Sequence, residues 1–110
     1  MDISNIIKKL DLEVIAGYEG QEIDVQGAYI GDLLSVVMAN AKLNNIWITI
    51  QTHLNVVAVA NLVELAAVII AEDMEIDKDT ISKANQLNIP LLKSKDTAYE
   101  LACKLNELGV

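Results

Sequence analysis

The chain has 110 residues and a mass of 12.0 kDa, which is the size of one domain. Its eight basic residues are all lysines, and the formal net charge of −8 argues against a nucleic-acid partner, whose phosphates would be repelled. Apolar residues make up 53% of the chain, which excludes wholesale disorder. One cysteine and one histidine exclude an internal disulfide and argue against a zinc site, so we expect no metal and no cofactor.

The amino-terminal residues lack the basic and apolar regions of a signal peptide. The longest apolar stretch, 56–71, is shorter than the roughly 18–20 residues of a membrane span. Glu64 would also lie near the middle of the bilayer, where an acidic group costs about 2.5 kcal/mol or more. We therefore expect two buried elements joined at Glu64, no membrane association and a cytoplasmic protein.

Apolar periodicity and turn residues predict alternating elements along the chain. In order, these are a helix over 3–10, a strand over 13–16, a strand from 23 that ends at Gly31, a helix over 32–42, a strand over 46–50, a helix over 55–65, a strand over 67–71, a helix over 78–87, a strand over 89–92 and a helix over 97–108. The predicted helix starts are Asp32, Asn55, Asp77 and either Ser94 or Asp96, and Asn88 is the predicted left-handed stop of the fourth helix.

The strands over 46–50 and 67–71 are apolar at nearly every position, which is typical of strands covered on both sides. Helices alternate with these strands, which favours a mainly parallel sheet. The predicted fold class is therefore α/β: one compact domain over 1–110, with helices on both faces of the sheet.

Three further residues or segments carry predictions about burial. Trp47, inside an apolar strand, is expected in the core rather than as a stacking platform. Cys103 is expected to be a buried, inert thiol because no histidine or basic cluster adjoins it in sequence. The segment 33–41 is more apolar than a lone surface helix requires, which indicates burial between subunits and hence a homodimer.

Polar segments follow the predicted parallel strands, and ligands of such sheets bind at the carboxyl ends of the strands. The candidate ligand-binding residues are Tyr29, Asp32, Gln51, Thr52, His53, Asn55, Glu72, Asp73, Ser94 and Thr97. Two interpretations stay open for 51–53: an anion-binding loop before a helix, or polar residues that only cap that helix.

The acidic run between Glu72 and Asp79 lacks the spacing of an EF-hand, and a solvated loop explains it better than a metal site. No pair of carboxylates, serine or cysteine has the setting of a catalytic residue, and His53 has no acidic partner evident in sequence. We expect no catalytic residues and no enzymatic activity, with an enzyme that uses His53 and a nearby carboxylate as the lesser alternative.

Several segments together resemble small stand-alone DRTGG-type domains. They are 27–41, 47–60, 67–71, the helix to Leu87, 88–92 and 97–108, and they cover nearly the whole chain. The resemblance extends to the N-terminal domain of bacterial HPr kinase/phosphorylase and to domains found with phosphate acetyltransferases and CBS-domain pyrophosphatases. Small relatives of this kind are often encoded beside iron-only hydrogenases in anaerobic bacteria.

The signature residues of that family are not retained. The chain has no arginine, and the Asp-Arg position falls near Thr52 and His53, while Ala71, Glu72 and Asp73 stand at the Thr-Gly-Gly position. The kinase activity of HPr kinase belongs to a separate domain with a phosphate-binding loop, which this sequence lacks. The resemblance implies a non-catalytic regulatory or small-ligand-binding domain; the alternative is a protein–protein adaptor linked to hydrogenase assembly or regulation.

Overall fold

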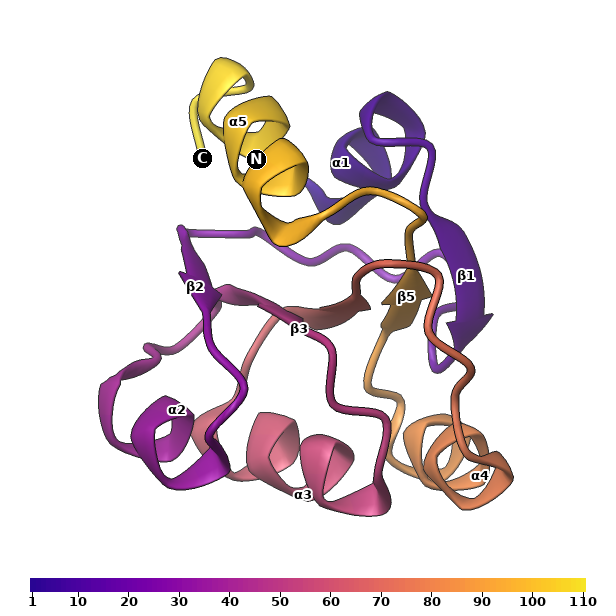
Figure 1. Ribbon diagram of the computed structural model, residues 1–110. Coiled ribbons are helices and arrows are strands. Elements are labelled where there is room, and N and C mark those ends of the chain that lie inside the picture. Colours follow the sequence, from indigo (N-terminus) through magenta and orange to yellow (C-terminus); the bar gives the residue numbers. More distant parts are fainter.

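The computed structural model describes all residues, 1–110, as a five-stranded sheet between two layers of helices (Figure 1). The elements are α1 (Ile3–Lys9), β1 (Glu13–Ala16), β2 (Ala28–Ile30), α2 (Leu34–Asn40), β3 (Ile46–Thr49), α3 (Leu54–Val63), β4 (Ala67–Ile70), α4 (Lys78–Leu87), β5 (Leu91–Lys93) and α5 (Ala98–Glu107). The predicted α/β class and order of elements are confirmed.

The strand order is β1-β5-β4-β3-β2, and neighbours from β2 to β5 are parallel. β1 pairs antiparallel with β5 and places Glu13 opposite Lys93. Every residue of β3 and β4 is buried, as their uninterrupted apolar sequences predict. The carboxyl ends of β2, β3, β4 and β5 therefore share one edge of the sheet with the start of β1.

The helices cover the two faces unequally, with α2, α3 and α4 on one face and α1 and α5 on the other (Figure 1). Successive residues of β3 alternate between two separate hydrophobic clusters: Ile46 and Ile48 pack with α1 and α5, and Trp47 packs with α3. Trp47 is fully buried, which confirms its predicted place, and its indole Nε1 donates to Gly31 O at 2.8 Å.

Two helices end in left-handed residues. Glu64, with φ 60°, ends α3, and Asn88, with φ 54°, ends α4. Glu64 is thus the joint between α3 and β4 that the sequence predicts, and Asn88 is the predicted helix stop. No helix in the structure is long and apolar enough to span a membrane.

Several predicted boundaries are wrong. The predicted strand from residue 23 is reduced to β2. Before β2, Asp24 forms only an isolated bridge with Asp2, and the buried Val25 packs with α1, so this segment does not extend the sheet. The last strand begins at Leu91, not at residue 89, because the residues from Asn88, which ends α4, to Pro90 form the connection between α4 and β5.

Cys103 is exposed, contrary to the prediction. Leu101 and Leu105, four residues apart, form the buried side of α5. Because Cys103 lies halfway between them in sequence, it falls on the opposite side of the helix, and the helical periodicity alone contained this information.

Candidate functional site

The structure divides the candidate residues into two groups. One group lies in or after β2 and β3 and comprises Tyr29, which is inside β2, and Asp32, Gln51, Thr52, His53 and Asn55. The other follows β4 and β5 and comprises Glu72, Asp73, Ser94 and Thr97. The two groups differ in whether they border open space, because a cavity opens only beside the second.

In the first group, Asp32 joins the ends of β2 and β3. Its carboxylate Oδ1 accepts hydrogen bonds from Thr49 Oγ1 at 2.8 Å and from the Ile50 backbone N–H at 3.0 Å. Gln51 Nε2 donates to Asp32 O at 2.9 Å. The prediction that Asp32 caps the following helix is therefore wrong: Leu33 occupies the N-cap of α2, and the Asp32 carboxylate is used across the strands.

A second set of contacts joins α3 to α4. His53 is the N-cap residue of α3, in place of the predicted Asn55, which lies exposed in the first turn. His53 Nδ1 lies 3.1 Å from Asp77 Oδ2, so the acidic partner that the sequence did not reveal comes from the N-cap of α4. Thr80 Oγ1 donates to Thr52 O at 2.7 Å. These polar groups bind one another, and neither cavity of the structure is lined by them.

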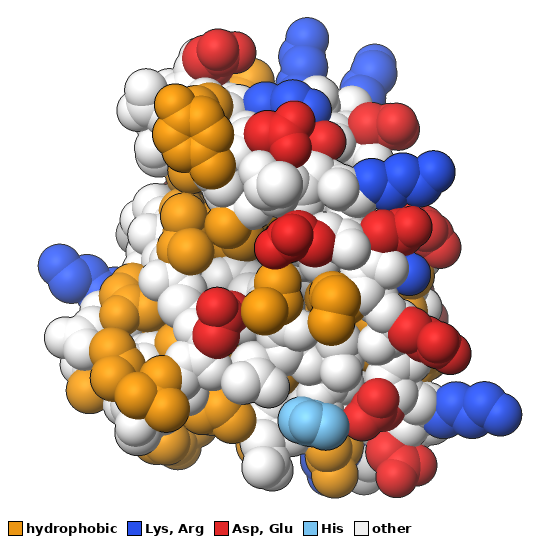
Figure 2. All heavy atoms as spheres, in the orientation of Figure 1, with side chains coloured by type: hydrophobic (Ala, Val, Ile, Leu, Met, Phe, Trp, Pro, Cys, Tyr) orange, Lys and Arg blue, Asp and Glu red, His pale blue; other side chains and the backbone are white.

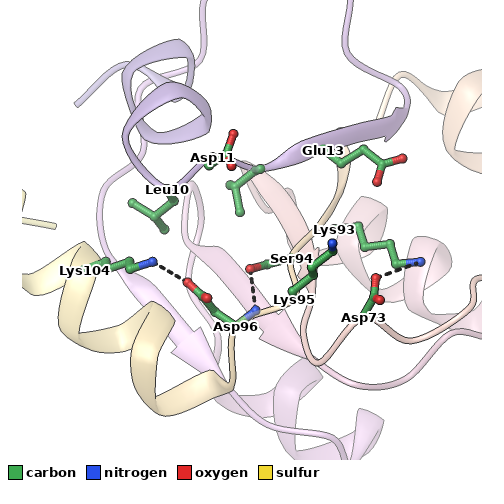
Figure 3. A pocket seen from close by; sticks show the side chains of 10 residues that line it. Leu10, Asp11, Glu13, Asp73, Lys93, Ser94, Lys95, Asp96 and Lys104 are labelled. Atoms are coloured by element: carbon green, nitrogen blue, oxygen red, sulfur yellow. Dashed lines mark hydrogen bonds and ion pairs between the residues drawn. The ribbon is translucent and has the colours of Figure 1, made fainter.

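A cleft of about 540 Å³ opens beside the second group (Figure 3). One wall is the connection from α1 to β1, with Asp11 and Glu13. The other wall is the connection from β5 to α5 together with Asp73 and Lys104; its remaining lining residues are Lys93, Ser94, Lys95 and Asp96. Leu10 and Leu12, both buried, provide the apolar part of the lining.

The position of the cleft follows from the topology. The connection after β4 leads to α4 on one face of the sheet, whereas the connection after β5 leads to α5 on the other face (Figure 1). Where neighbouring connections leave a parallel sheet toward opposite faces, a crevice remains at the carboxyl ends of the strands, and ligands of α/β proteins bind there. The cleft lies at this edge of the sheet, but between β5 and the start of β1, because backbone hydrogen bonds join the loops after β4 and β5.

The turn after β4 has an unusual backbone. Glu72 and Asp73 both have positive φ, 62° and 55°, which is the conformation that glycine adopts most readily. Their backbone N–H groups donate to Asp96 O at 2.9 Å and to Ser94 O at 2.8 Å. The loop after β4 is therefore held against the connection from β5 to α5.

Ion pairs hold two of the three cleft lysines. Lys93 Nζ lies 3.5 Å from Asp73 Oδ1, and Lys104 Nζ lies 2.5 Å from Asp96 Oδ2. The hydrogen bond with Asp96 raises the pKa of the Lys104 ammonium above its ordinary value. Lys95 forms no ion pair, and neither do the carboxylates of Asp11 and Glu13 on the other wall.

The remaining two members of the second group are hydrogen-bonded locally. Ser94 Oγ accepts from the Asp96 N–H at 3.0 Å. Thr97 forms a capping box with Glu100 at the start of α5, so the cap is Thr97 and not the predicted Ser94 or Asp96. Sequence reasoning places the polar segment 93–97 at this edge but names only Ser94 and Thr97 as ligand contacts, and so it misses Lys93 and Lys95. It had no comparable signal for Asp11 and Glu13.

Comparison with known proteins bears on the fold. No protein-family model and no curated protein sequence matches the chain. Among solved structures it is similar to the CBS and DRTGG domains of the regulatory region of Clostridium perfringens pyrophosphatase, determined with the activator diadenosine tetraphosphate. The TM-score is 0.75 at 13% sequence identity, over 94% of this chain and 45% of that one. The chain therefore has a DRTGG-like fold and spans less than half of the structure that it matches.

Proposed function

We propose that this chain is a non-catalytic regulatory domain that binds a small molecule in the cleft between the α1–β1 and β5–α5 connections. The observation that carries the proposal is the position of the cleft, which lies at the carboxyl-end edge of the parallel strands, between β5 and the start of β1, and which contains unpaired charged side chains. A volume of about 540 Å³ is within the range of small-molecule sites. The similar fold in a regulatory region of another protein supports a regulatory role.

The proposal assigns no chemistry to the histidine. The side chains of His53 and Asp77 are 71% and 53% exposed, and neither residue lines a cavity. Their contact joins the starts of α3 and α4, as does the hydrogen bond between Thr80 and Thr52. We assign these groups the role of positioning the two helices.

The proposed functional unit is a homodimer formed through α2 and the neighbouring edge strand β2. Ile30, Leu33, Val36 and Met38 are 43–66% exposed there, and Figure 2 shows hydrophobic side chains gathered in the region of α2. Asp32 is the only charged residue between Gly27 and Ala41. Two copies that each carry a net charge of −8 repel least where their surfaces are uncharged, which favours a second copy as the occupant of this surface.

Ligand binding is tested by thermal unfolding with a panel of nucleotides, acyl phosphates, amino acids and divalent cations. We expect at least one class to raise the melting temperature, because a ligand that binds only the folded state stabilises it. The Lys95→Gln variant should lose most of that shift. The matched control is Lys78→Gln, which removes an exposed, unpaired lysine on α4, outside the cleft.

The absence of a shift with every class would refute the ligand-binding role. An equal loss of the shift in both lysine variants would show that the ligand binds outside the cleft. If no ligand binds and the chain is monomeric, the exposed surface of α2 instead favours the adaptor role.

A further inference from the structure

The walls of the cleft differ in the sign of their unpaired charge. The ion pairs of Lys93 and Lys104 are made with Asp73 and Asp96, which belong to the same wall, so no ion pair crosses the opening. The unpaired groups are Lys95 on this wall and the carboxylates of Asp11 and Glu13 on the other (Figure 3). An ion pair formed across the cleft would have closed it, whereas these groups remain available to a ligand.

The charge balance excludes two simple ligand classes. Three lysines face four carboxylates in the lining, so the cleft has one negative charge in excess. A polyphosphate would bring several negative charges into this surrounding and would be repelled. A bare metal ion needs several oxygen ligands converging on one point, and no group of three or more histidine, cysteine or acidic side chains is arranged in this way.

We infer that the ligand of the cleft is a small zwitterion of the α-amino acid type. Its carboxylate binds the ammonium group of Lys95, and its own ammonium group binds the carboxylate of Glu13, which lies apart from that of Asp11 on the same wall (Figure 3). Charge-assisted hydrogen bonds of both signs then replace the missing ion pair across the opening. The ligand adds no net charge to a cleft that already holds nearly balanced charges. This inference rests on the proposed ligand-binding function and specifies the class of ligand.

The backbone supports fixed positions for both walls. Glu13 lies directly opposite Lys93 in the antiparallel register of β1 and β5. The α1–β1 wall is therefore held beside the opposite wall, which carries the three lysines of the cleft and is called the lysine wall below. On the lysine wall, the backbone bonds from Glu72 and Asp73 to Asp96 and Ser94 fix the chain on either side of Lys95. A site whose walls are fixed before binding loses less entropy when the ligand binds.

The inference is tested by titration calorimetry on the full chain with the proteinogenic L-amino acids. The tightest binder is then compared with its methyl ester, which lacks the carboxylate charge, and with its N-acetyl derivative, which lacks the ammonium charge. We expect each derivative to bind about tenfold more weakly or worse, because each loses charge-assisted hydrogen bonds.

Variants then assign each charge of the ligand to its wall. Lys95→Gln should weaken the free amino acid about tenfold but leave the methyl ester unchanged, since the ester has no carboxylate for Lys95 to bind. Glu13→Gln should weaken the free amino acid but not the N-acetyl derivative. Lys78→Gln and Glu22→Gln make the same charge changes at exposed residues outside the cleft and should have no effect.

Equal affinity for the amino acid and both derivatives would overturn the inference. Binding of inorganic phosphate or a nucleotide without binding of any amino acid would also overturn it, while the proposed ligand-binding function would stand. If none of these compounds binds, and no acyl phosphate or divalent cation raises the melting temperature either, both proposals fail together.

Discussion

At the scale of single residues, Gly17 shows how closely the chain just after β1 approaches the chain just before β5. A Cβ atom at Gly17 would lie 1.9 Å from Ile89 O and 2.9 Å from Ala84 O. The Gly17 N–H also donates to Asn85 Oδ1 at 2.9 Å. Glycine is required here both for its φ of 74° and for space, because the backbone after α4 occupies the position of a side chain.

We predict that Gly17→Ala lowers the free energy of unfolding by more than about 4 kcal/mol, because the added Cβ forces the backbone to shift or leaves it severely strained. The matched control is Gly20→Ala. Gly20 has a similar φ of 87°, but nothing lies within 4 Å of an added Cβ. The control should therefore lose only the conformational penalty of about 1 kcal/mol. Urea denaturation followed by the fluorescence of the buried Trp47 measures both, and equal losses would contradict the steric explanation.

At the scale of elements, the start of α5 holds the lysine wall of the cleft. Thr97 Oγ1 accepts from the Glu100 N–H at 3.2 Å, and the Glu100 carboxylate Oε1 accepts from the Thr97 N–H at 3.1 Å. The Thr97 hydroxyl is engaged in this cap, although the sequence offered it as a ligand contact. Thr97 affects the site only indirectly: it caps α5, and α5 positions Lys104 for its ion pair with Asp96.

Thr97→Ala should lower the free energy of unfolding by about 1 kcal/mol, the usual loss for an N-cap hydroxyl. Asn106→Ala is the control, since Asn106 is exposed near the end of the same helix and its side chain makes no hydrogen bond. Chemical denaturation of the two variants compares them. A loss at Asn106 as large as that at Thr97 would show that the capping box contributes nothing specific.

At the scale of the whole molecule, the two edges of the sheet differ. The β1 edge lies beside the cleft and carries Glu13, whereas the β2 edge continues into the exposed apolar surface of α2. Of the residues in α2, only Val37 is buried. A short helix with one buried residue gains little from packing within the chain, which supports a second copy as its partner.

Light scattering coupled to gel filtration should give twice the chain mass of 12.0 kDa. Leu33→Asp should convert the dimer to a monomer, because it places a second carboxylate beside Asp32 on each copy. Tyr99→Asp is the matched control: Tyr99 is 78% exposed, but it lies on α5, on the other face of the sheet. A 12.0 kDa species for the unmodified chain, or dissociation by both variants, would contradict the proposed surface.

The sequence by itself determined the class of fold and the order of elements. The apolar runs of β3 and β4 could be stable only as strands covered on both faces, and Asn88 could end α4 because its backbone tolerates positive φ. The edge of the sheet that carries the polar loops followed from the parallel order. These features depend on local periodicity and on residues close together in the chain.

Only the tertiary structure decided how the polar residues are used. Asp32 binds Thr49, and His53 binds Asp77, instead of serving the caps or ligand site that their neighbours in sequence suggested. Among the candidate residues, the cleft is lined by Asp73 and Ser94. The antiparallel pairing of β1 with β5 brings Asp11 and Glu13 to the lysines that follow β5. Such pairings join segments that are far apart in the chain, and the hydrophobic packing of the whole domain selects them. Local sequence patterns therefore do not predict them.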